Sequence, residues 1–298
     1  MSDGTLLDAR GIGVRFGGVR ALDDVDISVR SGEVCGLIGP NGAGKTTLFD
    51  VLSGIRRPDR GRVLLDGTDV SRRSPVWRAR HGVRRTFQRQ QLFGQLTVTD
   101  NLVVAQEWRR GPLAARRARA AQVLRSCGLD ALAGTYAGAL PVGQARMVEL
   151  ARALADPPRL LLLDEPASGM SAEERGQLAA VVRYMADEEG CAVLLVEHHV
   201  SFVMELCARV VVLDLGRVLA EGPAERVRAD PRVRAAYLGT GEGAETPGPA
   251  TAPGPATTPG PATAPGPRAA SGPAGVPHPP DSHPADSSRP AGSPGTAE

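Results

Sequence analysis

The chain has 298 residues, and its 35 Lys and Arg residues nearly balance its 33 Asp and Glu residues, which leaves a formal net charge of +2 at pH 7. This charge is too small to indicate a nucleic acid as a partner. The sequence has neither a signal peptide nor an apolar run near the roughly 18 residues of a membrane-spanning helix, so we expect a chain that does not enter a membrane on its own.

The composition changes at about Gly241, beyond which Pro, Gly, Ala, Thr and Ser dominate. A repeat that reads PGPATA over 247–252 begins again, with small changes, at Pro253, Pro259 and Pro265. Such a segment cannot bury enough apolar surface to offset the entropy of an ordered chain, so we predict a disordered tail over 241–298. The spacing of its glycines excludes a collagen helix, which needs glycine in every third place. The tail is either a spacer or partner-binding segment, or a dispensable extension.

The cysteines show no metal-ligand spacing; they are Cys35, Cys127, Cys191 and Cys207. Cys35 and Cys191 lie in apolar runs that are typical of strands. We therefore expect all of them to be reduced core residues of a cytosolic protein.

The stretch 39–47 reads GPNGAGKTT and fits the phosphate-binding P-loop pattern GxxxxGK[ST], with Gly39, Gly44, Lys45 and Thr46 in the fixed places. The residues before it, 33–38, are mostly apolar and suit a buried strand, and residues 46–53 suit a helix. A strand, a glycine-rich loop and a helix form the context that this motif requires.

The residue types in this loop predict its chemistry. Gly42 and Gly44 have no Cβ, so the backbone can curl with its N–H groups pointing at an anion, and the helix that follows adds its positive end. Lys45, the only lysine in the chain, supplies a compact charge for the β and γ phosphates of a nucleotide. The hydroxyl of Thr46 can ligate Mg²⁺. The loop therefore predicts a site for ATP with Mg²⁺.

Before the P-loop, residues 6–16 and 19–29 predict two strands joined at Gly17-Gly18. Phe16 ends the first strand, and taken alone it would be a core aromatic. After the P-loop, residues 61–65 predict a further strand of the same layer, with a turn at Asp66-Gly67.

The middle of the chain predicts helices over 96–108, with Thr99 as the cap, and over 116–127. An arginine cluster in this region either contacts anionic lipid or an acidic partner, or forms a solvated face; its members are Arg109, Arg110, Arg116, Arg117 and Arg119. A further helix over 145–155 ends at Pro157-Pro158.

Residues 159–164 contain four consecutive leucines and end in Asp164, which Glu165 follows. A fully apolar strand belongs to a parallel sheet covered on both faces, and ligands of such sheets lie off the carboxyl ends of the strands. Asp164 and Glu165 should therefore emerge beside the P-loop. There Asp164 can hold Mg²⁺, and Glu165 can polarise the water that attacks the γ phosphate.

Residues 172–189 predict an amphipathic helix, and residues 192–197 predict another apolar strand that ends in an acid. His198 follows this strand and either contacts the γ phosphate or is a structural or exposed histidine. The remaining predicted elements are a strand pair over 210–213 and 217–220 and a short final helix over 231–238.

The P-loop, Gln88, LPVGQ over 140–144, LLLLDEP over 160–166 and Glu197-His198 stand in this order along the chain. With these motifs, residues 5 to 239 resemble the ATPase subunit of an ATP-binding cassette (ABC) transporter. The resemblance implies an α/β fold in which a RecA-like P-loop NTPase core carries an N-terminal antiparallel β subdomain and an inserted α-helical subdomain. The nucleotide-binding domain would span 1–240, with the helical subdomain at about 90–157.

The resemblance also implies roles for single residues. Phe16 would stack on the adenine, and Gln88 would reach the metal and sense the membrane partner. Asp164 would be a metal anchor beside Thr46, Glu165 the general base and His198 the switch histidine, with the D-loop at 168–171. The phosphates would be held by Gly39, Pro40, Asn41, Gly42, Ala43, Gly44, Lys45, Thr46 and Thr47.

In this family two ATPase subunits dimerise head to tail with ATP at the interface, and they act on transmembrane permease subunits at the cytoplasmic face of the cell membrane. Three sequence segments are similar to the first ATPase of branched-chain amino acid importers: GVRRTFQ over 82–88, LTVTDNLVVAQ over 96–106 and DPRVRAAYLG over 230–239. Those importers also use a solute-binding protein, and none of the implied partners is a nucleic acid. The alternatives are a cassette for another small polar solute such as urea, a low-activity ATP-binding partner, and a non-transport ABC ATPase.

The signature sequence departs from the usual LSGGQ, because this chain has Leu140, Pro141, Val142, Gly143 and Gln144 in its place. In the family this segment completes the ATP site of the opposite subunit. Pro141 lacks both the hydroxyl and the N–H of serine, and Val142 adds bulk where the backbone should approach phosphate. Ser171 likewise stands where the D-loop usually ends in Asp. We predict that the chain's own P-loop site is competent. We also predict that its signature segment, the half-site that it contributes to the partner's ATP site, is weakened. The two ATP sites of a heterodimer would then be unequal.

Overall fold

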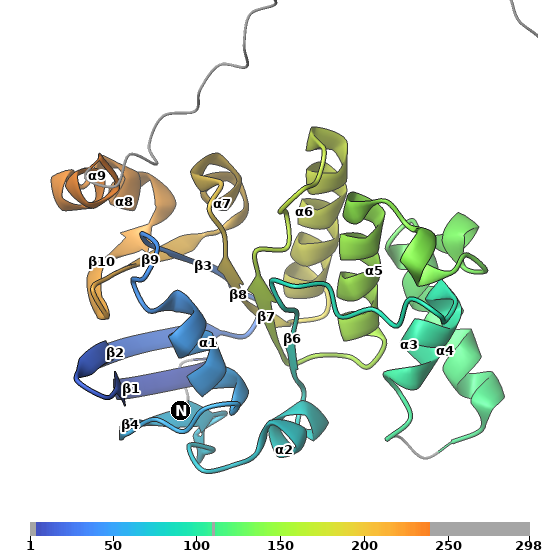
Figure 1. Cartoon of the computed structure of the whole chain (residues 1–298), viewed down its shortest axis with the longest axis horizontal. Helices are drawn as coiled ribbons and strands as arrows, with labels where there is room; N and C mark the ends of the chain where they lie inside the picture. The colour runs from blue at the N-terminus through green and yellow to red at the C-terminus, as the bar shows by residue number, and fades with distance from the viewer. Residues whose placement is uncertain (1–3, 109–110, 239–298) are drawn as a thin grey trace, which may run out of the picture. The chain divides into compact units, whose positions relative to one another are not determined.

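The computed structural model describes residues 4–108 and 111–238 (Figure 1). An antiparallel sheet has the strand order β2-β1-β4-β5. Its strands are β1 (Thr5–Phe16), β2 (Val19–Arg30), β4 (Arg60–Leu65) and β5 (Thr68–Asp69). Phe16 pairs with Val19 across the turn at Gly17-Gly18, so the predicted hairpin is confirmed, and the third predicted strand does lie in the same layer.

A second, six-stranded sheet has the order β10-β9-β3-β8-β7-β6. Its strands are β3 (Val34–Ile38), β6 (Val83–Arg85), β7 (Leu160–Asp164), β8 (Ala192–Val196), β9 (Arg209–Asp214) and β10 (Arg217–Pro223). The five strands from β9 to β6 run parallel, and β10 pairs antiparallel with β9. Every residue of β3, β7 and β8 is buried, which explains why these strands are continuous apolar runs in the sequence.

Two hydrophobic cores lie on opposite faces of the six-stranded sheet. Leu160 and Leu162 belong to the core that the sheet shares with the antiparallel layer and with α1 (Lys45–Ser53). Leu161 and Leu163 belong to the core that it shares with the helices of the other face. Because side chains alternate along a strand, one run of leucines fills both cores.

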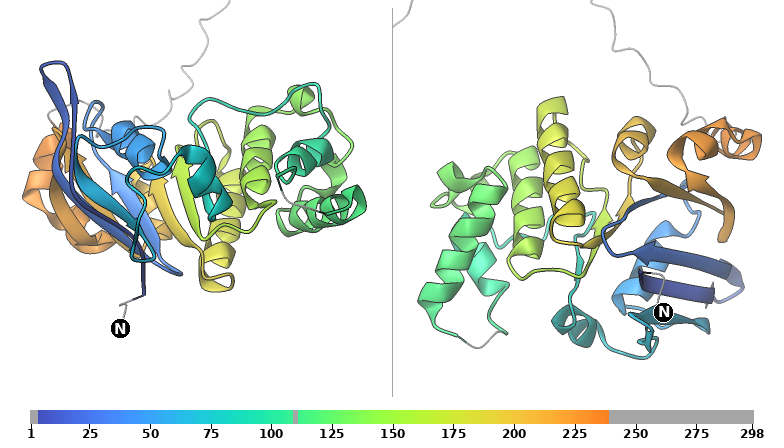
Figure 2. Two further views of the ribbon diagram at one scale, coloured as in Figure 1. Left: turned by 90° about the horizontal axis from the view of Figure 1, so that it is seen from below. Right: turned by 180° about the vertical axis from the view of Figure 1, so that it is seen from behind.

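On this other face lie α5 (Val142–Leu154), α6 (Ala172–Asp187) and α7 (Val200–Leu206) (Figure 1). The helices α3 (Val98–Val104), α4 (Leu113–Ser126) and α5 gather on the far side of β6 and β7 from the antiparallel sheet (Figure 2). Two 3-10 turns, η1 (Asp130–Leu132) and η2 (Ala137–Ala139), connect α4 to α5. The remaining helices are α2 (Pro75–Arg80), α8 (Ala224–Ala229) and α9 (Pro231–Leu238).

The predicted cap of α3 is wrong. Thr97, not Thr99, is the N-cap, because its Oγ1 accepts a hydrogen bond of 3.1 Å from the backbone N–H of Asp100. Thr99 lies within the helix and donates its hydroxyl to the carbonyl of Ala133 at 2.9 Å. The helix is also shorter than predicted, since it ends at Val104.

All four cysteines are buried and free, as predicted. Within the described residues, no helix is long and apolar enough to span a membrane.

The predicted tail over 241–298 and the residues Arg109 and Arg110 lie outside the described part of the chain. Of the remaining arginines in that cluster, Arg117 is exposed, whereas Arg116 and Arg119 are half-buried.

Candidate active site

The P-loop joins the end of β3 to the start of α1, and its backbone geometry requires glycine. Gly39 and Gly44 have φ values of 156° and 105°. A Cβ at Gly39 would lie 2.1 Å from the carbonyl oxygen of Leu213, and one at Gly44 would lie 2.5 Å from that of Ala21. Backbone atoms cannot move away from such contacts cheaply, so the loop is packed tightly on its inner side. A Cβ at Gly42 would have no neighbour within 4 Å, so at that point the loop is open.

The lysine of the loop is buried, and its ammonium lies over the loop backbone. The Nζ of Lys45 donates to the carbonyl oxygens of Gly39 at 2.6 Å and Pro40 at 3.0 Å. These contacts hold the charge at the loop itself rather than in solvent. Thr46, the next residue, is exposed in the first turn of α1, where a hydroxyl is available to a ligand.

The residues predicted to act on the phosphates follow three neighbouring parallel strands. In the sheet register, Leu37 of β3 pairs with Val196 of β8, and Val196 pairs with Asp164 of β7. The P-loop, Glu165 and His198 therefore emerge at the same carboxyl edge of the sheet. This is the edge at which ligands of parallel sheets bind.

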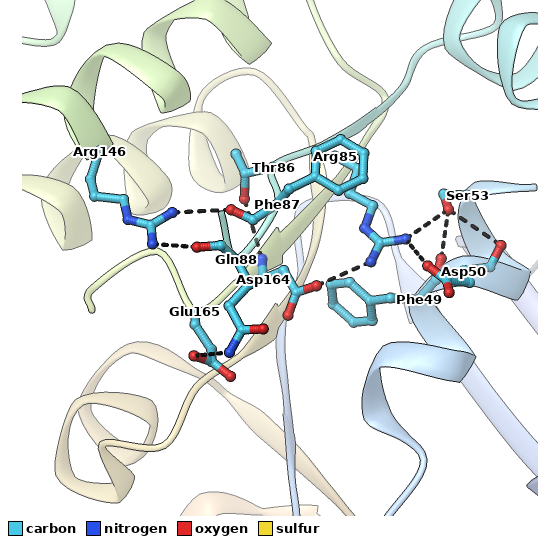
Figure 3. Close-up of polar contacts among 10 residues, drawn as sticks. All are labelled: Phe49, Asp50, Ser53, Arg85, Thr86, Phe87, Gln88, Arg146, Asp164 and Glu165. Atoms are coloured by element: carbon cyan, nitrogen blue, oxygen red, sulfur yellow. Dashed lines mark hydrogen bonds and ion pairs between the residues drawn. The ribbon is translucent and has the colours of Figure 1, made fainter. Parts of the chain in front are cut away.

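Glu165 has a strained backbone and an engaged carboxylate. Its φ of 50° lies in the left-handed region, which costs a non-glycine residue about 1 to 3 kcal/mol. Gln88 donates from its Nε2 to Oε2 of Glu165 at 3.0 Å, and Nε2 of His198 lies 2.8 Å from Oε1 (the first contact is drawn in Figure 3). Strain of this kind is typical of functional positions, and here it places the carboxylate between two polar side chains.

Asp164 is buried at the end of β7, where its backbone N–H donates to Thr86 Oγ1 at 3.2 Å. The guanidinium of Arg85 lies 3.1 Å from its Oδ2 (Figure 3). Burial raises the pKa of the Asp164 carboxyl, and the charge and hydrogen bond of Arg85 oppose that rise. The arginine therefore supports the ionised form that a metal ligand needs.

Three polar residues near the site were given no role from the sequence: Arg85, Arg146 and Glu197. Glu197 is buried directly after β8, and its carboxylate accepts from the N–H groups of Ala167 at 2.7 Å and His198 at 3.0 Å. Arg146 on α5 donates to the carbonyls of Phe87 at 3.0 Å and Gln88 at 2.5 Å (Figure 3). The sequence identifies Glu197 as the acid at the end of an apolar strand, but not the two N–H groups that it accepts from. An arginine-rich chain offers no sign of which arginines are buried.

Phe16 is 50% exposed, which counts against the alternative that it is a core aromatic. The guanidinium carbon of Arg56 lies 3.9 Å from the centre of its ring, which leaves the aromatic side chain at the surface beside a cation. The expected stacking of Phe16 on an adenine stays a prediction.

The signature segment begins α5, and its two unusual residues occupy the helix start. Pro141 is the N-cap residue and makes no side-chain capping hydrogen bond, and Val142 is 55% exposed. Gly143 is buried so tightly that a Cβ there would lie 2.1 Å from Oε2 of Glu174. Leu140 and Gln144 are half-buried. The segment lies with α5 on the far side of β7 from α1, so it is separate from the chain's own P-loop (Figure 1).

The residues expected to hold Mg²⁺ fit that ion. A hydroxyl, an amide oxygen and a carboxylate, from Thr46, Gln88 and Asp164, are hard oxygen donors. Within the described residues there is no cluster of three or more His, Cys, Asp or Glu side chains that could cage a metal. Mg²⁺ is usually bound by one or two carboxylates together with nucleotide phosphates and water, so an open donor set of this kind suits it.

Comparisons with known proteins place these features in a family. The sequence profile of the family described as ABC transporter matches residues 22–168, and that of the branched-chain amino acid ATP-binding cassette transporter matches residues 217–243. The high-affinity branched-chain amino acid transport ATP-binding protein BraF of Pseudomonas aeruginosa is 38% identical over 249 residues, which cover 78% of this chain and 98% of the relative. LivG of Escherichia coli, which has the same description, is 37% identical with the same coverage.

Solved structures agree with this assignment. A nucleotide-free ATP-binding cassette from an ABC transporter is 31% identical with a TM-score of 0.72, over 78% of this chain and 98% of that one. The ADP conformation of such a cassette is 31% identical with a TM-score of 0.73, over 79% and 99%. The two sheets, the P-loop and the acidic strand ends thus belong to a fold known to hold nucleotide. The chain is a member of the ABC transporter family and is one of its ATP-binding, ATP-hydrolysing cassettes.

Proposed function

We propose that this chain is the motor subunit of an importer for branched-chain amino acids. The observation that carries the proposal is the match of residues 217–243 to the branched-chain amino acid cassette profile, in a chain whose relatives are named for that transport. Cargo contacts belong to other subunits, so this part of the proposal depends on similarity and not on the site.

The chemistry depends on the chain's own residues. The amides of the P-loop and the ammonium of Lys45 bind the β and γ phosphates of ATP and orient them at the carboxyl edge of the sheet. Glu165 accepts the proton of the attacking water, and His198 and Gln88 hold the carboxylate in place. Thr46, Gln88 and Asp164 would hold Mg²⁺, which when bound neutralises charge on the phosphate oxygens.

We also propose an assembly in which this subunit pairs with a second cassette and both act on transmembrane permeases at the cytoplasmic face of the membrane. The separation of the signature segment from the P-loop supports pairing, because a segment at the start of α5 can then complete a partner's site. A solute-binding protein would deliver the cargo, and the helices α3 to α5 with the segment around Gln88 would transmit closure of the dimer to the permeases.

Reconstitution of the full complex in proteoliposomes tests this function. The complex should couple ATP hydrolysis to uptake of leucine, isoleucine or valine. Coupled uptake of urea instead would support the alternative cargo. If the subunit hydrolyses ATP no faster with its permeases than alone, and no solute is moved, the chain would be a low-activity ATP-binding partner and the proposal would be wrong.

The altered signature adds a proposal about asymmetry. Pro141 offers no N–H to a phosphate, and the exposed side chain of Val142 stands at the helix start, so the half-site lent to the partner is weak. Lys45→Ala should therefore abolish most turnover of the complex, whereas the equivalent lysine substitution in the partner subunit should remove little. An equal loss from both substitutions would contradict unequal sites.

A further inference from the structure

The guanidinium of Arg85 connects three elements of the active site. Its Nη1 donates to Oδ1 of Asp50 on α1 at 2.6 Å and to Oγ of Ser53 at 3.1 Å. Its Nη2 donates to Oδ2 of Asp164 at the end of β7 at 3.1 Å. Arg85 itself ends β6, from which the chain continues to Gln88 (Figure 3). One side chain thus joins the helix of the P-loop, the predicted metal-binding carboxylate and the Gln88 segment.

The surroundings of this guanidinium are closed. The side chain of Arg85 is only 6% exposed, and that of Asp164 is equally buried. The rings of Phe49 and Phe87 flank the guanidinium, with their centres 5.6 and 4.9 Å from its carbon. A planar fork held between aromatic rings has one orientation, so each of its two ends is aimed at a fixed partner.

The contact with Asp164 is one-sided. Arg85 engages Oδ2 alone, and no other side chain in the described part of the protein donates to that carboxylate. Oδ1 is therefore left to a ligand while Oδ2 fixes the rotation of the group. Asp50 accepts a hydrogen bond from the other end of the same guanidinium and so connects it to the helix that begins at Lys45.

We infer that Arg85 is a positioning residue that fixes the Asp164 carboxylate relative to the P-loop helix and so sets the affinity of the site for the nucleotide with its metal. The inference rests on the proposed Mg²⁺ ligands and concerns only this chain's residues. Arg85 would touch neither nucleotide nor metal. Residues that orient a metal ligand through a hydrogen bond typically account for a factor of about 10 to 100 in metal affinity.

The test measures binding of a fluorescent ATP analogue to the purified full chain, once with Mg²⁺ and once with EDTA. The ratio of the two affinities reports the metal's contribution without any turnover. If the unaltered chain binds the analogue much more tightly with Mg²⁺ than with EDTA, the proposed Mg²⁺ site is supported. The variants then test the inference about Arg85 separately. A ratio near one in the unaltered chain would reject the proposed metal site itself.

Arg85→Met should reduce this ratio about tenfold or more, while the affinity in EDTA stays within about twofold. Asp50→Asn keeps the contact with Asp164 but weakens the tie to α1, and it should reduce the ratio in the same direction by less. This second variant keeps the test available if Arg85→Met does not fold.

Arg84→Met is the matched control, because Arg84 precedes Arg85 on β6 and also pairs with a carboxylate, that of Asp156. Neighbouring residues of a strand point to opposite faces, so this substitution should lower stability and leave the ratio unchanged. An unchanged ratio in folded Arg85→Met would overturn the inference, since Arg85 would then be only structural. A raised ratio would also overturn it, because the arginine would then compete with the metal.

Discussion

Gln88 and Glu165 are joined by a hydrogen bond of 3.0 Å from the side-chain Nε2 of the first to Oε2 of the second. Nε2 of His198 lies 2.8 Å from the other oxygen of the same carboxylate. Two side chains from different loops thus fix the rotation of one carboxylate at the carboxyl edge of the sheet. A base that is oriented before the reaction does not have to be ordered during it.

His198→Ala should slow ATP hydrolysis by roughly 100-fold and leave ATP affinity nearly unchanged, because it removes one of the two groups that orient Glu165. Steady-state turnover of the assembled complex and equilibrium binding of a nucleotide analogue measure the two effects. His199→Ala is the control: His199 is half exposed, and its Nδ1 lies 3.5 Å from Glu197 rather than from Glu165. Equal losses from both substitutions would show that position 198 has no special role.

Arg146→Ala should destabilise the protein by about 3 kcal/mol, because it leaves the carbonyls of Phe87 and Gln88 without this donor and breaks a largely buried ion pair with Glu149. Urea unfolding measures the change. Arg183→Ala is the comparison, since Arg183 donates at the surface to a single carbonyl, that of Glu205 at 3.0 Å. The account of the Arg146 contacts fails if the two variants lose the same stability.

Burial raises the pKa of the Cys35 thiol to about 12, that of Cys191 to about 12 and that of Cys127 to about 11, from an ordinary value of 9.0. The folded state therefore keeps its thiol protons at a pH where the unfolded chain loses them. The free energy of unfolding is therefore highest below pH 9, the ordinary pKa of a thiol. It falls as the pH rises toward the pKa values of the buried thiols in the folded state. At pH 10 each of these thiols should lower the free energy of unfolding by about 1 kcal/mol relative to neutral pH.

Urea unfolding at pH 7.5 and pH 10 measures this loss. Cys35→Ala removes one thiol from the interior, so its stability should fall less steeply with pH than that of the unaltered chain. The thiols should also resist alkylation at pH 8 until the protein is unfolded, because all four are buried. A variant that shows the same slope as the unaltered chain would contradict the assignment to Cys35.

Pro141→Ser combined with Val142→Gly should strengthen the half-site that the chain lends to its partner. The measurement uses the complex in which Lys45→Ala has disabled the chain's own site, so that the ATP hydrolysis measured comes from the partner's site alone. Turnover should rise roughly tenfold or more, since an N–H and space for the phosphate are restored at the start of α5. Unchanged turnover in a folded complex would mean that the signature does not limit the partner's site.

The parts of the fold that could be predicted from the sequence depend on local signals. Continuous leucines mark β7, glycine and lysine mark the P-loop, and an acid at the end of an apolar strand marks Asp164. The short helices α2 and α7 were missed, because six or seven residues carry too little periodicity. Thr97 and Thr99 both precede an apolar run, and only the structure shows which hydroxyl meets the backbone.

The unpredicted part of the site depends on contacts between distant segments. Arg85 meets Asp50 and Asp164, which lie 35 and 79 residues away along the chain, and no local pattern encodes such a meeting. Phe16, taken alone as an aromatic at a strand end, would be expected in a core, and its exposure depends on which elements pack nearby. Motifs therefore predict which residues are candidates to bind ligand, whereas the residues that hold those candidates in place emerge only from the structure.

The central claim is that Glu165 accepts the proton of the water that attacks ATP bound at the P-loop. Glu165→Gln tests it most directly, because the amide keeps the shape of the side chain and its place between Gln88 and His198 but cannot act as the base. The account predicts that hydrolysis by the assembled complex falls by roughly 100-fold or more while the affinity for MgATP is retained. Hydrolysis at the unaltered rate in this variant would contradict the account.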